Sequence, residues 1–432
     1  MAQVIEADLT WTGSGFERGV RVGVGSDGRI TTVGGQSGDV TLRLAGRALL
    51  PGFVNAHSHA FQRGLRGRGE QFPSGSGSFW SWREAMYELV GQLDGTRFYE
   101  LTLQAFREML AAGITSVGEF HYLHHSASLD ETPKSAFDFD ELVLRAASEA
   151  GIRIVLLNVF YKTGGIGKPL LGDQLRFETR SIIEYWHQMD RLDKLRDPGL
   201  QSLGAVAHSI RAVPPDHLSI LHTEAKRRKL PFHMHVEEQP QEIQDSLLEY
   251  GKNPMSIVLD LEPGSEFTAV HCTHTTPSDL RRFLDLGGNI CITPLTEANL
   301  GDGTADHGEI RESMGQVSLG TDSNARISLI EEMRWLEYNQ RVTGEMRGAW
   351  IDEQGSVSRP ILRAATEGGA RALGIETGRI ATGLFADFAV VNLSASSLAG
   401  HDDESLLDVI IFGCSEEIIS DVCVGGDWKR VR

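Results

Sequence analysis

Eight short apolar segments of strand type recur along this chain, and each is followed by a helical pattern or a long loop. The segments are LLPGFVNAHSH (49–59), ITSVGEFH (114–121), IRIVLLNVF (152–160), SLGAVAHS (202–209), LPFHMHVEE (230–238), FTAVHCTH (267–274), NICITPLTE (289–297) and VSLGTDS (317–323). Between them, TRFYELTLQAFREMLAAG ends on Gly113 and DFDELVLRAASEAG ends on Gly151, as helices do. Strand followed by helix, eight times, predicts an α/β fold of the (β/α)8 TIM-barrel type.

Both ends of the chain have a different pattern from the middle. Residues 1–50 and 380–432, the latter including VIIFGCSEEIISDVCVGGDWKRVR, contain short alternating strands with turn residues between them. Neither part has enough strands to bury a core alone, so we expect the two to pair into one small β-sandwich domain. Residues 51–379 would then form the barrel.

The charge of the chain limits its partners. The formal net charge is −18, which repels nucleic acid and anionic membranes, so we expect neither as a partner. A small anionic substrate would need a local cluster of Arg. The cysteines form no C-x-x-C pair, the N-terminus lacks a signal-peptide pattern, and no run reaches the roughly 18 apolar residues of a membrane helix. These features favour the cytoplasm.

A His-x-His pattern, His57 and His59, lies at the end of the first barrel segment. Residues two apart on a strand point to one face, so both imidazoles can bind one cation. The pattern also arises by chance in core and exposed settings. His235 and Asp322 end the fifth and eighth segments, where barrel strands converge, and complete a set of three nitrogens and one oxygen suited to zinc. Without the other three, Asp322 would be interpreted as a turn residue.

Two further residues are placed to carry protons. Glu238 follows His235 by three residues, and His271 ends the sixth segment, where it can face a metal-bound water. Glu237 and Glu242 are interpreted as ordinary surface charges of an acidic loop. His274 competes with His271, and His233 competes as a ligand or as a partner behind the ligands; we rank both of them lower.

A second metal ion would need a bridging acid or a carbamylated Lys, usually at the end of the fourth strand. That end reads AVAHSIRAV and contains neither. One ion per chain is therefore the simpler prediction, although Lys162 after the third strand leaves room for another arrangement.

Seven motifs between residues 49 and 342 resemble those of the formimidoylglutamate deiminases, a branch of the amidohydrolase superfamily. They are PGFVNAHSHAFQRGLRG, FWSWRE, EFHYLHH, AHSIRAV, HVEEQ, TEANLGDG and EEMRWLEYNQR. The His-x-His pattern is shared by the whole superfamily, whereas FWSWRE, EFHYLHH and TEANLGDG are much more specific to this branch.

The resemblance implies a site with one zinc ion and a defined set of residues around it. Metal ligands would be His57, His59, His235 and Asp322; catalytic residues Glu238, His271 and Asp322; substrate contacts Gln62, Arg83, Tyr122, His208 and Arg211. The implied reaction is hydrolysis of N-formimino-L-glutamate to N-formyl-L-glutamate and ammonia in histidine degradation, and we expect a homodimer. In chemical terms, zinc lowers the pKa of its water to about 7, and Glu238 delivers a proton to the departing nitrogen.

The substrate carries two carboxylates, and Arg83 and Arg211 can each hold one through a planar bidentate pair. Two features depart from the family and could shift the substrate: Asn324 stands where His is usual, and the loop after Tyr161 differs from the usual glycine-rich form. One alternative is a deaminase of another small amidine or of a nucleobase such as guanine, which would stack the base on aromatic rings in place of two Arg. A non-catalytic barrel would lose ligands, yet all six metal and proton-carrier positions are filled.

Overall fold

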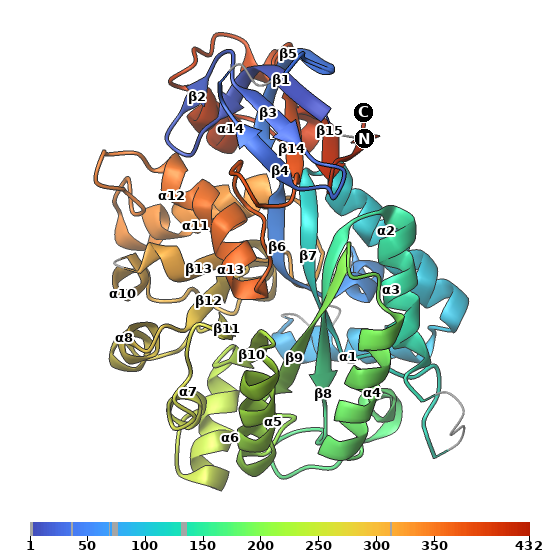
Figure 1. The fold of residues 1–432 in the computed structure, drawn as a ribbon. Helices are drawn as coiled ribbons and strands as arrows, with labels where there is room; N and C mark the ends of the chain where they lie inside the picture. Colours follow the sequence, from blue (N-terminus) through green and yellow to red (C-terminus); the bar gives the residue numbers. More distant parts are fainter. Residues whose placement is uncertain (1–2, 36–37, 69, 71–76, 131–135, 312) are drawn as a thin grey trace.

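Figure 1 shows the fold in a computed structural model, which describes residues 3–35, 38–68, 70, 77–130, 136–311 and 313–432. Eight parallel strands form the barrel sheet, and each pairs with the next one along the sequence. They are β6 (Phe53–Ser58), β7 (Ile114–His121), β8 (Arg153–Phe160), β9 (Gln201–Ser209), β10 (Phe232–Val236), β11 (Phe267–His271), β12 (Asn289–Ile292) and β13 (Val317–Leu319). Each lies on one of the eight predicted segments, so the barrel prediction is confirmed.

Helices follow the strands and cover the outside of the barrel (Figure 1). They are α1 (Phe79–Gly91), α2 (Gly95–Ala111), α3 (Asp138–Ala150), α4 (Ile182–Leu195), α5 (Pro215–Arg228), α6 (Pro240–Tyr250), α7 (Pro254–Leu259), α8 (Pro277–Asp285), α9 (Pro294–Leu300), α10 (His307–Arg311), α11 (Leu329–Gly344), α12 (Ser358–Arg363) and α13 (Gly369–Leu373). Helix α2 begins after Asp94, whose side chain accepts a hydrogen bond from the N–H of Arg97 at 2.8 Å. Helix α3 ends at Gly151, which has a left-handed φ of 70°. Within the described ranges, every helix falls short of the length or the apolar character that crossing a bilayer requires.

The barrel closes where the end of β6 meets the segment after β13. Ser58 and Asp322 form a parallel bridge there. Close approach depends on Gly320, because a Cβ at that position would lie 2.7 Å from the Cβ of His57. The closure therefore brings the first and last predicted metal ligands together.

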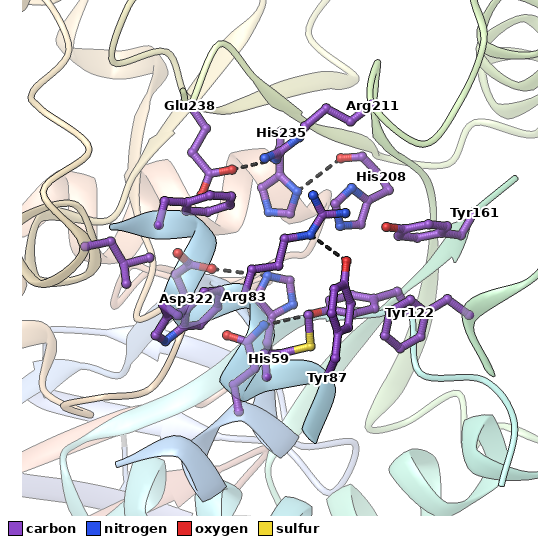
Figure 2. Close-up of a pocket in the computed structure, with 16 residues that line it drawn as sticks. His59, Arg83, Tyr87, Tyr122, Tyr161, His208, Arg211, His235, Glu238 and Asp322 are labelled. Carbon is purple, nitrogen blue, oxygen red and sulfur yellow. Dashed lines mark hydrogen bonds and ion pairs between the residues drawn. The ribbon is translucent and has the colours of Figure 1, made fainter. Parts of the chain in front are cut away.

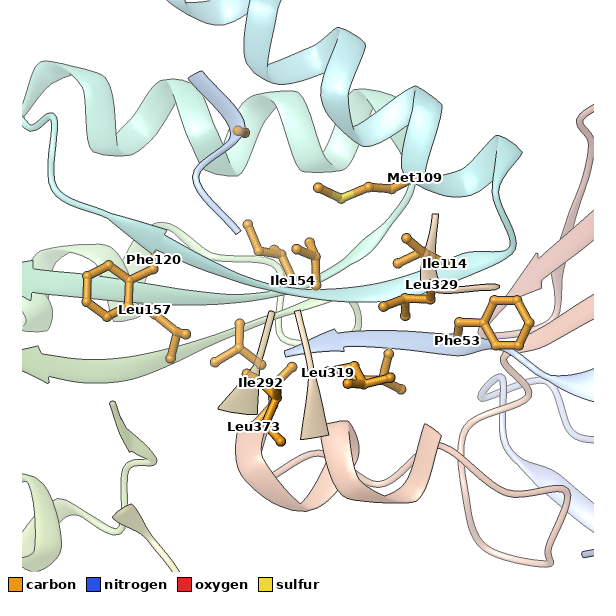
Figure 3. Close-up of a cluster of buried hydrophobic side chains, with 14 of the residues drawn as sticks. Phe53, Met109, Ile114, Phe120, Ile154, Leu157, Ile292, Leu319, Leu329 and Leu373 are labelled. Atoms are coloured by element: carbon orange, nitrogen blue, oxygen red, sulfur yellow. The ribbon is translucent and has the colours of Figure 1, made fainter. Parts of the chain in front are cut away.

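An apolar cluster fills the barrel and the layer between its strands and helices (Figure 3). Ile154 and Leu157 of β8 are completely buried, as are Phe120 of β7 and Met109 of α2. Leu373 of α13 packs in the same cluster. The burial of many such side chains, each stabilising by about 1.5–3 kcal/mol, holds the strand ends in fixed positions.

Strands from both ends of the chain form one separate sheet, as predicted. It contains β1 (Gln3–Trp11), β2 (Phe16–Glu17), β3 (Arg21–Val24), β4 (Ile30–Val33), β5 (Leu42–Pro51), β14 (Phe388–Asn392), β15 (Ile419–Val424) and β16 (Asp427–Arg430). In Figure 1 this sheet sits at one end of the barrel, with both termini beside it.

One part of the prediction for the two ends of the chain was wrong. VIIFG, interpreted as a strand, belongs to helix α14 (Leu406–Gly413). Leu406, Leu407, Ile410 and Ile411 are buried there, one helical turn apart in pairs, because the segment packs against α11 and α12. Local apolar content alone does not distinguish a short buried helix from a strand.

Candidate active site

A cavity of about 50 Å³ lies at the carboxyl ends of the barrel strands (Figure 2). Strand ends supply its histidines, and helix α1 closes one side of it. The lining residues are His59, Gln62, Phe79, Trp82, Arg83, Met86, Tyr87, Tyr122, Tyr161, Phe177, His208, Arg211, His235, Glu238, Leu300 and Asp322. Active sites of barrel enzymes form at this face.

Four donor atoms face one another beside this cavity: Nε2 of His57, His59 and His235, and a carboxylate oxygen of Asp322. Nε2 of His57 lies 3.2 Å from Nε2 of His59 and 3.1 Å from Nε2 of His235. Oδ1 of Asp322 lies 3.2 Å from Nε2 of His57 and 3.1 Å from Nε2 of His59. A tetrahedral ion with bonds of about 2.0 Å separates its ligand atoms by roughly 3.3 Å, so the set fits such an ion.

Backbone carbonyls orient two of these imidazoles from behind. Nδ1 of His59 lies 2.8 Å from the carbonyl oxygen of Phe120, and Nδ1 of His235 lies 3.1 Å from that of His208. Nδ1 of each ring therefore donates, which leaves the Nε2 lone pairs directed toward the cluster. Lone pairs that face one another repel, and a shared cation removes that repulsion. The donor set fits a resident divalent metal ion.

Burial keeps these ligands in the protonation state that metal binding needs. It lowers the pKa of His57 to about 3 and that of His235 well below its usual range. Burial would raise the pKa of Asp322, but the close approach of His57 and His59 holds it well below its usual range. The neutral rings of His57 and His235 and the carboxylate of Asp322 therefore offer lone pairs and a negative charge to a dication.

The two predicted proton carriers lie side by side next to the metal ligands. Oε1 of Glu238 is 3.7 Å from Nε2 of His271, and the His271 ring stacks on His235 with centroids 5.3 Å apart. Behind it, Nδ1 of His271 faces Oγ1 of Thr293 at 3.3 Å and Oε1 of Glu297 at 3.5 Å. Burial opposes the charged form of His271, yet Glu238 and Glu297 raise its pKa to about 10. Glu297 belongs to TEANLGDG, but nothing in the sequence pattern assigned it a partner.

The interpretation of Glu237 and Glu242 as surface charges was wrong. Glu237 is completely buried and accepts a hydrogen bond from the N–H of Met255 at 2.9 Å. Glu242 is buried as well, and neither of its carboxylate oxygens has a hydrogen-bond partner among the described residues. Burial raises the pKa of Glu242 to about 7. Glu242 lies in the first turn of helix α6, where its carboxylate faces Nε of Arg211 at 3.8 Å.

The two predicted carboxylate-binding arginines both line the cavity, and both have protein partners (Figure 2). Nη2 of Arg211 lies 2.6 Å from Oε2 of Glu238, and its Nε lies 3.8 Å from Oε2 of Glu242. Nε of Arg83 donates to the hydroxyl of Tyr87 at 2.5 Å. Arg83 therefore has neutral neighbours, whereas Arg211 already has a carboxylate partner.

The other three predicted substrate contacts also line the cavity. Nε2 of Gln62 donates to the hydroxyl of Tyr122 at 2.7 Å, which holds both groups at the wall. Nδ1 of His208 faces Oγ of Ser209 at 3.0 Å. Burial raises the pKa of Tyr122 and lowers that of His208, so both stay neutral and act as hydrogen-bonding groups.

Most of the wall that α1 contributes was not predicted from the sequence. Phe79, Trp82, Met86 and Tyr87 line the cavity beside Arg83. Their spacing of three or four residues places them on one face of the helix, so helical periodicity around FWSWRE could have identified them.

The two departures from the family pattern have different places in the structure. Asn324 is buried but does not line the cavity; its amide donates to Oγ of Ser58 and to the carbonyl oxygen of His59, both at 3.0 Å. It therefore supports the barrel seam behind a ligand. The loop after Tyr161 reaches the wall, because the carbonyl oxygen of Gly164 accepts a hydrogen bond from Nη2 of Arg83 at 3.3 Å.

The residues considered as alternatives do not join the metal set, that is, His57, His59, His235 and Asp322. Nε2 of His233 lies 2.8 Å from the carbonyl oxygen of Ala372, and Nζ of Lys162 donates to the carbonyl oxygen of Arg180 at 2.9 Å. His274 does not line the cavity, and His271 rather than His274 lies beside Glu238.

A second buried His/Asp group, from the EFHYLHH motif and α3, lies behind the cavity wall. Asp140 accepts four hydrogen bonds, from His121, His124, Asn158 and Gln188, at 2.8 to 3.0 Å. Both ring nitrogens of His124 face oxygens, because Nε2 lies 2.8 Å from the carbonyl oxygen of Val159. The group is a buried ion-pair network that holds the end of β7, from which Tyr122 enters the cavity.

Comparison with known proteins agrees with this geometry. The sequence profile of the amidohydrolase family matches residues 48–429. The chain belongs to the amidohydrolase family. Among similar amidohydrolases, formimidoylglutamate deiminase of Pseudomonas aeruginosa is 35% identical over 420 residues, which cover 96% of this chain and 91% of that protein. A protein named 5-methylthioadenosine/S-adenosylhomocysteine deaminase 2, of Archaeoglobus fulgidus, is 27% identical and covers 90% of this chain and 86% of its own length.

Solved amidohydrolase structures share the whole architecture. The crystal structure of an amidohydrolase from Brucella melitensis, 31% identical, has a TM-score of 0.88 and covers 100% of this chain and 95% of its own. An adenosine deaminase from Xanthomonas campestris with bound zinc, 24% identical, has a TM-score of 0.81 and covers 99% of this chain and 92% of its own. The β-sandwich domain and the barrel thus occur together in this fold.

Proposed function

We propose that this amidohydrolase deaminates N-formimino-L-glutamate, giving N-formyl-L-glutamate and ammonia, as a step of histidine degradation. One observation carries the proposal: a single cavity is lined both by metal-set residues and by two guanidinium groups, Arg83 and Arg211. The amidine carbon needs an activated water, and the two substrate carboxylates need two fixed cations. The 35% identity to a formimidoylglutamate deiminase supports the same assignment.

We propose that the resident ion is one Zn²⁺ per chain, held by His57, His59, His235 and Asp322. Such an ion is a Lewis acid that lowers the pKa of water to about 7 and so makes a nucleophile available at neutral pH. The three-nitrogen, one-oxygen donor set supports zinc over magnesium or calcium, which prefer all-oxygen sites.

The protein's own groups would move the protons. His271 and Asp322 steer the attacking water or accept its proton, and Glu238 delivers a proton to the departing nitrogen. Water oxygen adds to the formimino carbon, the carbon–nitrogen bond then breaks, its electron pair leaves with ammonia, and a formyl C=O remains. The 3.7 Å separation between Glu238 and His271 supports this pairing of roles.

Recognition of the rest of the substrate falls to the opposite wall. Arg83 and Arg211 would each bind one carboxylate, while Gln62, Tyr122 and His208 would hold the formimino group and the backbone of the substrate. All five line the cavity, and they come from four segments of the chain, since His208 and Arg211 both lie at the end of β9. A correct placement of both carboxylates would fix the amidine carbon beside the metal set.

Deamination of an aminopurine is the second candidate. Tyr122, Tyr161 and Phe177 provide aromatic surface, and a relative at 27% identity is named as a deaminase of 5-methylthioadenosine and S-adenosylhomocysteine. The two arginines in the cavity wall favour a small dianion over a neutral purine nucleoside. A non-catalytic role would not need all six metal and proton-carrier residues.

Ammonia release over a panel of formimino, guanidino and aminopurine compounds tests the proposal. We expect N-formimino-L-glutamate to have the highest kcat/KM, and zinc analysis of purified protein to give about one ion per chain. Turnover of an aminopurine alone, or two tightly held ions per active chain, would contradict it. We also propose a cytoplasmic homodimer with domain boundaries near residues 50 and 380, to be checked by sedimentation and limited proteolysis.

A further inference from the structure

Glu238 lies between two cationic partners in this structure. Its Oε2 is 2.6 Å from Nη2 of Arg211, and its Oε1 is 3.7 Å from Nε2 of His271. Both side chains of the Arg211–Glu238 pair are about nine-tenths buried, with 10% and 8% of their surface exposed. The bond is thus a short, charge-assisted one in a weakly hydrated place, where such bonds are strongest.

This pairing conflicts with the roles that the proposed reaction gives to both residues. A carboxylate that accepts a short hydrogen bond from a guanidinium is stabilised as the anion, so it accepts a proton less readily. The Nε and Nη2 edge of this guanidinium, which could hold a substrate carboxylate as a bidentate pair, faces Glu238 through Nη2 and donates to Oγ of Ser209 through Nε at 3.3 Å. Each residue must leave the other before it can act.

We propose that Arg211 is a gate that couples recognition of a substrate carboxylate to the release of Glu238 for proton transfer. The inference rests on the proposed function. A carboxylate that enters the cavity exchanges with Glu238 on Arg211, and Glu238 then turns toward the reacting nitrogen. Both residues line the same cavity, so the exchange needs side-chain rotation only.

Glu242 gives the gate its second support. Its Oε2 lies 3.8 Å from Nε of Arg211, on the same edge of the guanidinium as Nη2, and its carboxylate has no hydrogen-bond partner among the described residues. When Arg211 leaves Glu238, the carboxyl group of Glu242 remains beside the guanidinium. The guanidinium can therefore change one partner without becoming an isolated buried charge, which would be costly.

The gate predicts that a carboxylate activates turnover as well as binding. N-butylformamidine carries the reacting amidine without a carboxylate, so the Arg211–Glu238 pair stays closed and the wild-type kcat is low. Added propionate should raise that kcat several-fold. In Arg211→Met, N-butylformamidine should turn over faster than in the wild type and should not respond to propionate, while kcat/KM for N-formimino-L-glutamate falls.

Two variants separate the gate from simple structural damage. Arg83→Met also loses a carboxylate partner and should lose kcat/KM on N-formimino-L-glutamate, yet propionate should still activate its turnover of N-butylformamidine. If Arg211→Met folds poorly, Arg211→Met/Glu242→Gln replaces it, because the double variant also removes the negative charge beside the missing guanidinium. The results expected for Arg211→Met are then expected for the double variant. Metal content and melting temperature are measured for each.

The outcomes are distinguishable from those of the proposed function. No wild-type activity on N-formimino-L-glutamate would reject that substrate, while propionate activation of any amidine that is turned over would still support the gate. Absence of propionate activation in the wild type would overturn the gate, as would an equal loss of kcat on both substrates in Arg211→Met.

Discussion

The backbone N–H of Asp322 donates a hydrogen bond of 3.0 Å to the carbonyl oxygen of His57. The carbonyl oxygen of Asp322 in turn accepts from the N–H of His59 at 2.9 Å. These two bonds join the segment after β13 to the end of β6, at the predicted metal ligands. Closure of the barrel and geometry of the metal set depend on each other, and this dependence leads to the first two predictions.

Removal of the metal should destabilise the whole barrel. The ion would link β6, β10 and the segment after β13. At a free-ion concentration of about 100 times the dissociation constant, its binding adds about 2.7 kcal/mol to the free energy of unfolding. We expect the melting temperature to fall by several degrees after dialysis against a chelator and to recover when zinc is restored. Scanning calorimetry decides this, and an unchanged transition would argue against a resident ion.

Gly320→Ala should weaken metal binding through the barrel seam. The new Cβ would lie 2.7 Å from Cβ of His57 and 2.8 Å from its carbonyl oxygen, so the seam must open. Gly315→Ala is the matched control, because a Cβ there meets nothing within 4 Å. We expect lower zinc content and a lower melting temperature in Gly320→Ala alone. Equal behaviour of the two variants would mean that the seam tolerates the shift.

Glu238→Gln should retain the metal but lose most turnover. The amide can neither accept nor deliver the proton, so we expect kcat to fall by about 10²- to 10⁴-fold. Glu249→Gln, a change of the same kind at an exposed position of α6, should leave kcat unchanged. Zinc content is measured beside the kinetics. Substantial activity in Glu238→Gln would move the proton transfer to another group.

Asp140→Asn should destabilise the fold in a pH-dependent way. Burial would raise the pKa of Asp140, but His124 and His121 hold it far below its usual range. Because the unfolded value is about 3.9, the stabilisation is fully present above about pH 4 and is lost as the pH falls toward the folded pKa. Removing one partner of such a buried pair costs about 3–5 kcal/mol in the free energy of unfolding.

Urea titrations of wild type and Asp140→Asn at two pH values check this. The difference between them should be largest near neutral pH and should shrink at about pH 3. Asp193→Asn, at an exposed i,i+3 pair with Arg196, is the control and should cost about 1 kcal/mol or less. A pH-independent difference for Asp140→Asn would assign the loss to packing rather than to charge.

The barrel and the grouping of the four candidate metal ligands could be predicted because their signals are local. His57 and His59 share a face through the two-residue period of a strand, and the barrel topology brings the ends of β10 and β13 to them. The residues of α1 that line the cavity also repeat at helical spacing. Helix α14 was mistaken for a strand because its short apolar run fits both periods, and only packing against α11 and α12 distinguishes them.

By itself, the sequence determined the order of strands and helices, the ligand set and the candidate proton carriers, since these follow from periodicity and from the convergence of strand ends. The tertiary structure alone decided which charges meet. Glu242 is buried because α6 packs inward, and Arg211 faces Glu238 across 27 residues of chain. Such pairings depend on distances between separate elements and on the exclusion of water, and no spacing along the chain encodes either one.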